Sequence, residues 1–131
     1  MAKIKPQKVY LSWSDMENAV NYLTKVIKES GIKFKGVYGI PRGGLIFAVW
    51  FSHLLNLPVS TSPTKDMLIV DDISDKGDTL APYKYHKTVC IFTSLWTKTQ
   101  PTWSYFVKSD KRNWIVFPYE NKETEEKKDN A

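Results

Sequence analysis

A short apolar run, residues 67–70, is followed directly by two carboxylates, Asp71 and Asp72. An unbroken apolar run of this length is typical of a strand that is buried on both faces of a parallel sheet. Open α/β sheets bind their ligands beyond the carboxyl ends of such strands. The run therefore predicts an α/β fold with a functional site where the two acids stand.

The region before this run has the pattern of one strand and one helix. Residues 9–11 form a short strand candidate. Ser14, with Glu17 three residues later, makes a capping box that predicts the start of an amphipathic helix. Gly31 is placed to end that helix as its C-terminal cap.

A second strand and helix then lead to the central run. Residues 36–40 form the strand, and Gly43 with Gly44 opens a mostly apolar helix that ends near residues 56–58. Residues 89–92 are a further apolar run. The order strand, helix, strand, helix, strand, strand predicts a mainly parallel, twisted sheet with flanking helices.

Length and composition suit one domain. The chain has 131 residues, of which 42% are hydrophobic, enough for one compact core and too few for two ordinary domains. The single cysteine, Cys90, lies inside an apolar run, so we expect a core residue. The longest apolar stretch, residues 45–57, is too short and too interrupted to span a bilayer, and no signal peptide pattern precedes it. We expect a cytoplasmic protein without a membrane partner.

The net charge of +5 is unevenly distributed. Residues 120–131 hold five acidic and three basic side chains, which leaves +7 on the residues before them. We expect residues 121–131 to be a disordered tail, because they are charged and poor in apolar side chains. A basic body can bind nucleic acid, an anionic surface or a phosphorylated small molecule, or it can simply be solvated. Charge alone does not separate these alternatives.

The residues that follow the two acids have the composition of a phosphate-binding turn. Residues 74–79 are small or polar around Gly77, and they lead toward what we expect to be the start of a helix. Main-chain N–H groups at such a turn can hold an anion. Asp71 and Asp72 suit ribose hydroxyls or a Mg²⁺ ion. The alternative is an Asp-rich surface turn, but the buried strand before it favours a sugar-phosphate site.

Residues 70–80 resemble the motif that binds 5-phosphoribosyl-1-pyrophosphate (PRPP) in type I phosphoribosyltransferases. The resemblance implies that Asp71 and Asp72 contact the ribose hydroxyls, with Asp72 also on the metal. It makes Asp75 the catalytic acid/base facing N7 of a purine. The whole turn would bind the 5′-phosphate through Asp75, Lys76, Gly77, Asp78 and Thr79. Lys76 departs from the family, in which a threonine is usual at this position.

Two further segments resemble the same family. Residues 39–45 resemble the pyrophosphate loop, which implies that Arg42 and Gly43 belong to the PRPP site, often with a cis peptide bond before the arginine. Residues 114–120 resemble the closing segment of the xanthine and hypoxanthine–guanine branch. There Trp114 and Ile115 would line the base pocket, although a core strand with a partly buried Trp is the alternative.

The chain also departs from the family in two places. Residues 60–66 are too short to be the long flexible loop that covers the reacting centre in family enzymes. Purine enzymes carry a lysine that contacts O6 of the base, and at the matching position this chain has Ser94, with Lys98 as the nearest substitute. The segment 80–87 is short for a full crossover helix. These features predict a reduced member of the family.

The resemblance implies one domain over residues 1–120, with a small C-terminal hood from about residue 93. It implies Mg²⁺-dependent transfer of the phosphoribosyl group from PRPP to a purine base, of the 6-oxopurine kind, by a homo-oligomer. Its partners would be PRPP and a purine base or nucleoside monophosphate. A regulatory protein of the same fold that binds PRPP or a nucleotide with reduced catalysis is the alternative. Nucleic-acid binding is a weaker hypothesis, since no recognised motif supports it, and we expect none.

Overall fold

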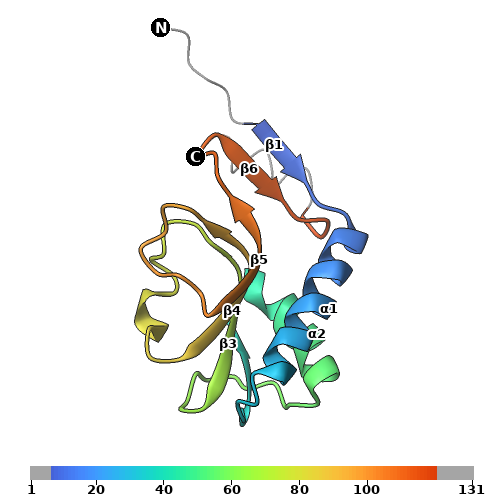
Figure 1. Ribbon diagram of the computed structural model, residues 1–131, viewed down its shortest axis with the longest axis vertical. Coiled ribbons are helices and arrows are strands. Elements are labelled where there is room, and N and C mark those ends of the chain that lie inside the picture. Colours follow the sequence, from blue (N-terminus) through green and yellow to red (C-terminus); the bar gives the residue numbers. More distant parts are fainter. Residues whose placement is uncertain (1–6, 121–131) are drawn as a thin grey trace, which may run out of the picture.

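The computed structural model describes residues 7–120. A four-stranded sheet has the order β2-β3-β4-β5, and every neighbouring pair is parallel (Figure 1). The strands are β2 (Gly36–Gly39), β3 (Met67–Ser74), β4 (Lys87–Ser94) and β5 (Trp103–Lys108). A second, two-stranded parallel sheet pairs β1 (Gln7–Tyr10) with β6 (Asn113–Val116) at one end of the molecule. The predicted α/β fold with a mainly parallel sheet is confirmed.

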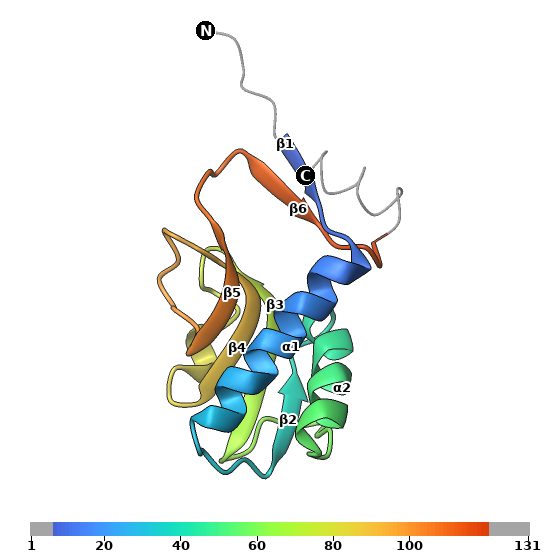
Figure 2. The same ribbon diagram turned by 45° about the vertical axis from the view of Figure 1, so that its right-hand side comes forward.

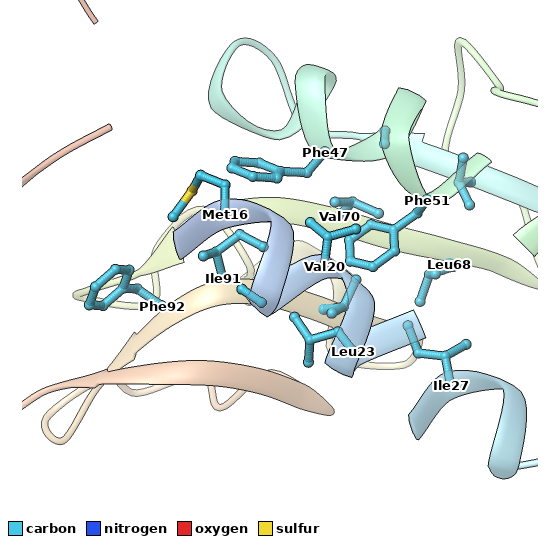
Figure 3. Packing of buried hydrophobic residues seen from close by; sticks show 14 of the residues in the cluster. Met16, Val20, Leu23, Ile27, Phe47, Phe51, Leu68, Val70, Ile91 and Phe92 are labelled. Carbon is cyan, nitrogen blue, oxygen red and sulfur yellow. The ribbon is translucent and has the colours of Figure 1, made fainter. Parts of the chain in front are cut away.

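Both α-helices of residues 7–120 lie side by side on the same face of the sheet (Figure 2). The first, α1 (Trp13–Glu29), contacts β4 and β5, and the second, α2 (Gly43–Leu55), contacts β2 and β3. Their apolar side chains meet those of alternate strand residues in one core (Figure 3). The largest fully buried side chains there include Met16, Leu23, Phe47, Phe51 and Leu68.

A smaller apolar cluster covers the opposite face of the sheet. Leu80 is buried there against Ile69 and Cys90. A 3₁₀ turn, η1 (Ala81–Tyr83), follows Leu80 and contains Pro82 in its first turn. No α-helix follows the 74–79 turn, so the predicted helix start at this point is wrong. The segment between Leu80 and β4 is too short for a crossover helix, as its length indicated.

The start of α1 differs from the prediction by two residues. Ser12 is the N-cap, with an extended backbone, and its Oγ accepts a hydrogen bond from the Asp15 N–H at 3.0 Å. The Asp15 carboxylate accepts from the Ser12 N–H at 2.8 Å, which completes the capping box. Ser14, in contrast, lies inside the first turn. Gly31 follows the C-cap with a φ of +71°, as expected for the glycine at a helix end.

The strands around the site also extend further than the sequence predicted. Pairing of β3 with β4 continues to Ser74 and Thr93, so Asp71 and Asp72 lie within a strand rather than in a loop after it. Pairing of β4 with β5 makes β5 the edge of the main sheet. The predicted hood from residue 93 therefore shrinks to β6, its pairing with β1 and the residues around them. The predicted tail, 121–131, lies outside the described residues.

The outward face of α2 is apolar. Leu45 and Val49 are 44% and 49% exposed, and Leu54 is exposed one turn further along. The helix carries no charged residue in its sequence, apart from any charge on His53. A surface helix normally has a polar outer face, so this one is unusual. Among residues 7–120, no helix is long and apolar enough to cross a membrane.

We predict that replacing Phe51 with alanine destabilises the protein far more than replacing Val49. Phe51 is fully buried between α2 and the sheet, so its removal leaves a cavity and should cost about 3–5 kcal/mol. Val49 is on the same helix and half exposed, so Val49→Ala should cost less than about 0.5 kcal/mol. Urea unfolding followed by circular dichroism measures both. Phe51→Leu serves if the alanine variant does not fold, and equal losses would contradict the packing described.

Candidate functional site

A pocket of about 520 Å³ opens at the carboxyl end of β3. Three segments that are distant in the sequence line it: the loop before α2, the end of β3 with the following turn, and the start of β6. The predicted site residues in its wall are Gly43, Asp71, Asp72, Asp75, Lys76, Gly77, Asp78, Thr79 and Trp114. Ile115 lines an adjoining smaller pocket. Arg42 lines neither pocket and is exposed beside Pro41, which does line the larger one.

The acid pair is partly buried at the base of this pocket. The Asp71 side chain accepts a hydrogen bond from the Asp72 N–H at 2.9 Å, and Asp72 accepts one from the Ile73 N–H at 2.8 Å. Burial, and then the adjacent charge of Asp72, raise the pKa of Asp71 well above its usual range. A cation or a set of hydroxyl donors in the pocket would stabilise the charged form of this pair.

The acid pair also suits a metal that arrives with a phosphorylated ligand. Among the described residues, no group of three or more His, Cys, Asp and Glu side chains could hold a metal ion alone. Mg²⁺ commonly takes one or two carboxylates and completes its shell with phosphate oxygens and water. The two adjacent carboxylates of Asp71 and Asp72 therefore fit Mg²⁺ bound together with a phosphate ligand.

The loop before α2 packs directly on the acids. A Cβ atom on Gly43 would collide with the Asp72 carboxylate, and one on Gly44 would collide with the Val70 carbonyl. Only glycine permits so close an approach of the helix start to β3. The peptide bond between Pro41 and Arg42 is cis, as the resemblance of this loop to the family's pyrophosphate loop implied.

Residues 97–99 pack against the 75–79 turn and form hydrogen bonds with it. Gly77 has a φ of +92°, and a Cβ there would lie 2.6 Å from both Thr97 Oγ1 and the Thr99 N. Thr99 Oγ1 donates to the Gly77 carbonyl at 2.8 Å. The Lys98 N–H donates to the Lys76 carbonyl at 3.1 Å, while the Lys98 ammonium pairs with Asp78. The 75–79 turn is therefore supported by residues 97–99, and not by a helix that begins directly after it.

Asp75 makes contacts that the sequence did not predict. Its Oδ2 lies 3.1 Å from Lys108 Nζ, and its Oδ1 accepts from the Trp96 indole N–H at 3.0 Å. The Lys108 side chain is only 7% exposed. Neither Trp96 nor Lys108 belongs to any of the segments that the sequence singled out.

The position of Lys108 follows from strand register. Ser94 on β4 and Lys108 on β5 are direct partners across the parallel ladder. Lys98, the substitute that the sequence suggested for a base-contacting lysine, pairs with Asp78 instead. Lys108 lines the smaller pocket with Asp75, Trp114 and Ile115. No motif contains it, because its place depends on how β5 adds to the sheet.

These features define a class of α/β protein in which a buried acid pair and a glycine turn line one pocket, and a cationic side chain lines a smaller pocket beside it. No family model and no curated protein sequence matches the chain. Solved structures do match. A purine phosphoribosyltransferase from Pyrococcus horikoshii Ot3 is 30% identical with a TM-score of 0.76, and the match covers 88% of this chain and 95% of that one.

Two more solved structures share the fold at lower identity. A xanthine-guanine-hypoxanthine phosphoribosyltransferase from Helicobacter pylori is 18% identical, with a TM-score of 0.72 over 93% of this chain and 99% of its own. A hypothetical protein from Neisseria gonorrhoeae with bound ppGpp is 16% identical, with a TM-score of 0.74 over 95% of each chain. The chain belongs to the type I phosphoribosyltransferase family, as its 30% identity with the purine phosphoribosyltransferase over nearly the whole of that chain shows.

We predict that Gly77→Ala destabilises the protein more than Gly31→Ala. Both glycines have positive φ, so both substitutions strain the backbone by roughly 1 kcal/mol. Only at Gly77 would the new methyl group also meet atoms, because nothing lies within 4 Å of a Cβ at Gly31. The difference in the urea unfolding midpoint between the two variants measures the contact with residues 97–99. Equal midpoints would contradict it.

Proposed function

We propose that the protein transfers the 5-phosphoribosyl group from PRPP to a 6-oxopurine base. The observation that carries this proposal is that Asp75 lines two adjoining pockets, one with the acid pair and the Gly77 turn, the other with its ion-pair partner Lys108. Membership of the phosphoribosyltransferase family supports the class of reaction.

Each part of PRPP would meet a group in the pocket or beside it. Asp71 and Asp72 would accept hydrogen bonds from the ribose hydroxyls, and the 75–79 turn would bind the 5′-phosphate. Arg42 would turn inward from its exposed position to bind the pyrophosphate, since its planar guanidinium can hold two phosphate oxygens. Asp72 would hold Mg²⁺, and the bound ion would neutralise part of the negative charge on the departing pyrophosphate.

The transfer breaks the bond between ribose C1 and the pyrophosphate oxygen, and forms a bond from C1 to N9 of the base. The pyrophosphate leaves with the bonding electron pair, so C1 passes through a cation-like state. As N9 attacks, the base becomes more acidic, and Asp75 would accept the proton that leaves N7. Most of the rate would come from holding the two reactants in line and from stabilising the leaving charge.

The pairing of Asp75 with Lys108 supports a 6-oxopurine rather than adenine. Lys108 Nζ and Asp75 Oδ2 are 3.1 Å apart in the pocket wall, so a donor stands beside an acceptor. The O6 and N7–H edge of hypoxanthine or guanine presents the complementary order, an acceptor beside a donor. Adenine carries an amino group in place of O6 and would leave the ammonium without an acceptor.

A second candidate function is nucleotide binding without efficient transfer. Residues 60–66 form only a short exposed segment, too short to exclude water from the reacting centre as a lid would. One neighbour of the same fold is described with bound ppGpp. This chain would then respond to a guanine nucleotide or to PRPP with the same pocket and little turnover.

We also propose that the protein forms a homo-oligomer through the apolar outward face of α2. Leu45 and Val49 are exposed there, immediately after the loop that carries Arg42. A second copy on this face would bury apolar side chains and stand next to the pocket mouth. Repeating the transfer assay at falling protein concentration, beside a measurement of molecular mass, tests this proposal.

We predict that the protein, given PRPP, Mg²⁺ and hypoxanthine, guanine or xanthine, releases pyrophosphate and forms the nucleoside monophosphate, whereas with adenine it does not.

Asp75→Asn should lower transfer and leave PRPP affinity nearly intact, because Asp75 acts on the base. Asp72→Asn should weaken PRPP binding in the presence of Mg²⁺. Binding of guanine nucleotides without pyrophosphate release would favour the second candidate. Failure to bind PRPP or any monophosphate at millimolar concentration would refute both.

We predict that Lys108→Met lowers the affinity for GMP roughly 10- to 100-fold and changes that for AMP little, because a charged hydrogen bond to O6 is lost. Lys98→Met is the comparison. Lys98 supports the phosphate turn through Asp78, so its loss should weaken GMP and AMP binding equally. Calorimetric titrations of GMP and AMP against the wild type and each variant give the change in affinity for each nucleotide. Unchanged discrimination in Lys108→Met would contradict the assignment of Lys108.

A further inference from the structure

Trp96 lies behind Asp75 and outside the wall of either pocket at the site. Its indole N–H donates to Asp75 Oδ1 at 3.0 Å, on the carboxylate oxygen that Lys108 does not bind. Since Asp75 and Lys108 line the smaller pocket and Trp96 does not, any influence of Trp96 on a bound base passes through these two side chains.

The Trp96 ring is also fixed by charge. Lys108 Nζ lies 5.7 Å from the ring centroid, and Lys111 Nζ lies 5.4 Å from it. Ammonium groups are attracted to an indole face at such distances. One side chain thus contacts both members of the Asp75 and Lys108 pair, through its N–H on one and its π-face on the other.

We propose that Trp96 is a positioning residue that sets the discrimination between 6-oxopurine and 6-aminopurine ligands. This inference rests on the proposed function and deepens it. A carboxylate rotates readily about χ2, because that torsion has broad minima. Holding Oδ1 on the indole leaves Oδ2 directed at the pocket beside Lys108 Nζ. The Ser94 hydroxyl, which donates to the Asp75 carbonyl, restrains the backbone of the same residue.

The arrangement has a consequence for the base but not for the sugar. Trp96 makes no contact with Asp71, Asp72 or Gly77 in the hydrogen bonds of the described residues. Loss of its N–H should let the Asp75 carboxylate turn, so that Lys108 Nζ, which pairs with Oδ2, is no longer fixed toward O6. Recognition of O6 should weaken while PRPP binding stays as it is.

The test compares Trp96→Phe with Trp103→Phe. The two substitutions make the same chemical change, and Trp103 packs edge-on against Phe34 in the core, away from the pocket. Trp96→Phe should lower GMP affinity and kcat roughly tenfold, leaving AMP affinity and the KM for PRPP unchanged. Trp103→Phe should leave the ratio of GMP to AMP affinity as in the wild type.

A spectroscopic signal separates positioning from a general loss of structure. The indole N–H resonance of Trp96, identified in ¹⁵N-correlated spectra by its absence from Trp96→Phe, should shift in Asp75→Asn and on addition of GMP. If wild-type protein binds GMP but Trp96→Phe keeps full discrimination, the inference is overturned and the proposed function stands. If the wild type binds neither PRPP nor any nucleotide, the proposed function fails, and the inference fails with it.

Discussion

The parallel pairing of β3 with β4 is the constraint on which the site depends. Because the ladder continues from Leu68 to Ser74, the two acids are fixed by main-chain hydrogen bonds on a strand whose preceding residues are fully buried. The same ladder lets the start of α2 approach closely, since Gly43 and Gly44 then meet a rigid surface. A flexible loop at this point could not hold two like charges together at a partly buried position.

The addition of β5 to the ladder supplies the other half of the site. Its register with β4 sets Lys108 opposite Ser94, where the ammonium reaches Asp75. An alignment along β4 alone finds Ser94 and misses the ammonium group that its register partner on β5 brings to Asp75.

Most of the fold and much of the site could be predicted from local patterns. The run before Asp71 predicted a buried parallel strand, and the glycines after Arg42 predicted a tight strand-to-helix turn. The contacts of Asp75 could not be predicted, because Lys108 and Trp96 are 33 and 21 residues away and belong to no motif. The capping box was misplaced since two serines two residues apart, Ser12 and Ser14, both precede an acid at the required spacing.

Leu80 is buried immediately after Thr79, while Ser74 is buried at the end of β3. The proposed phosphate turn is therefore an arc of five residues with both ends anchored in the folded body. Few backbone conformations remain open to such an arc before any ligand arrives, so little conformational entropy is left to lose when an anion binds. The 75–79 turn would then be preorganised for an anion by folding alone, and not by the closure of a loop over it.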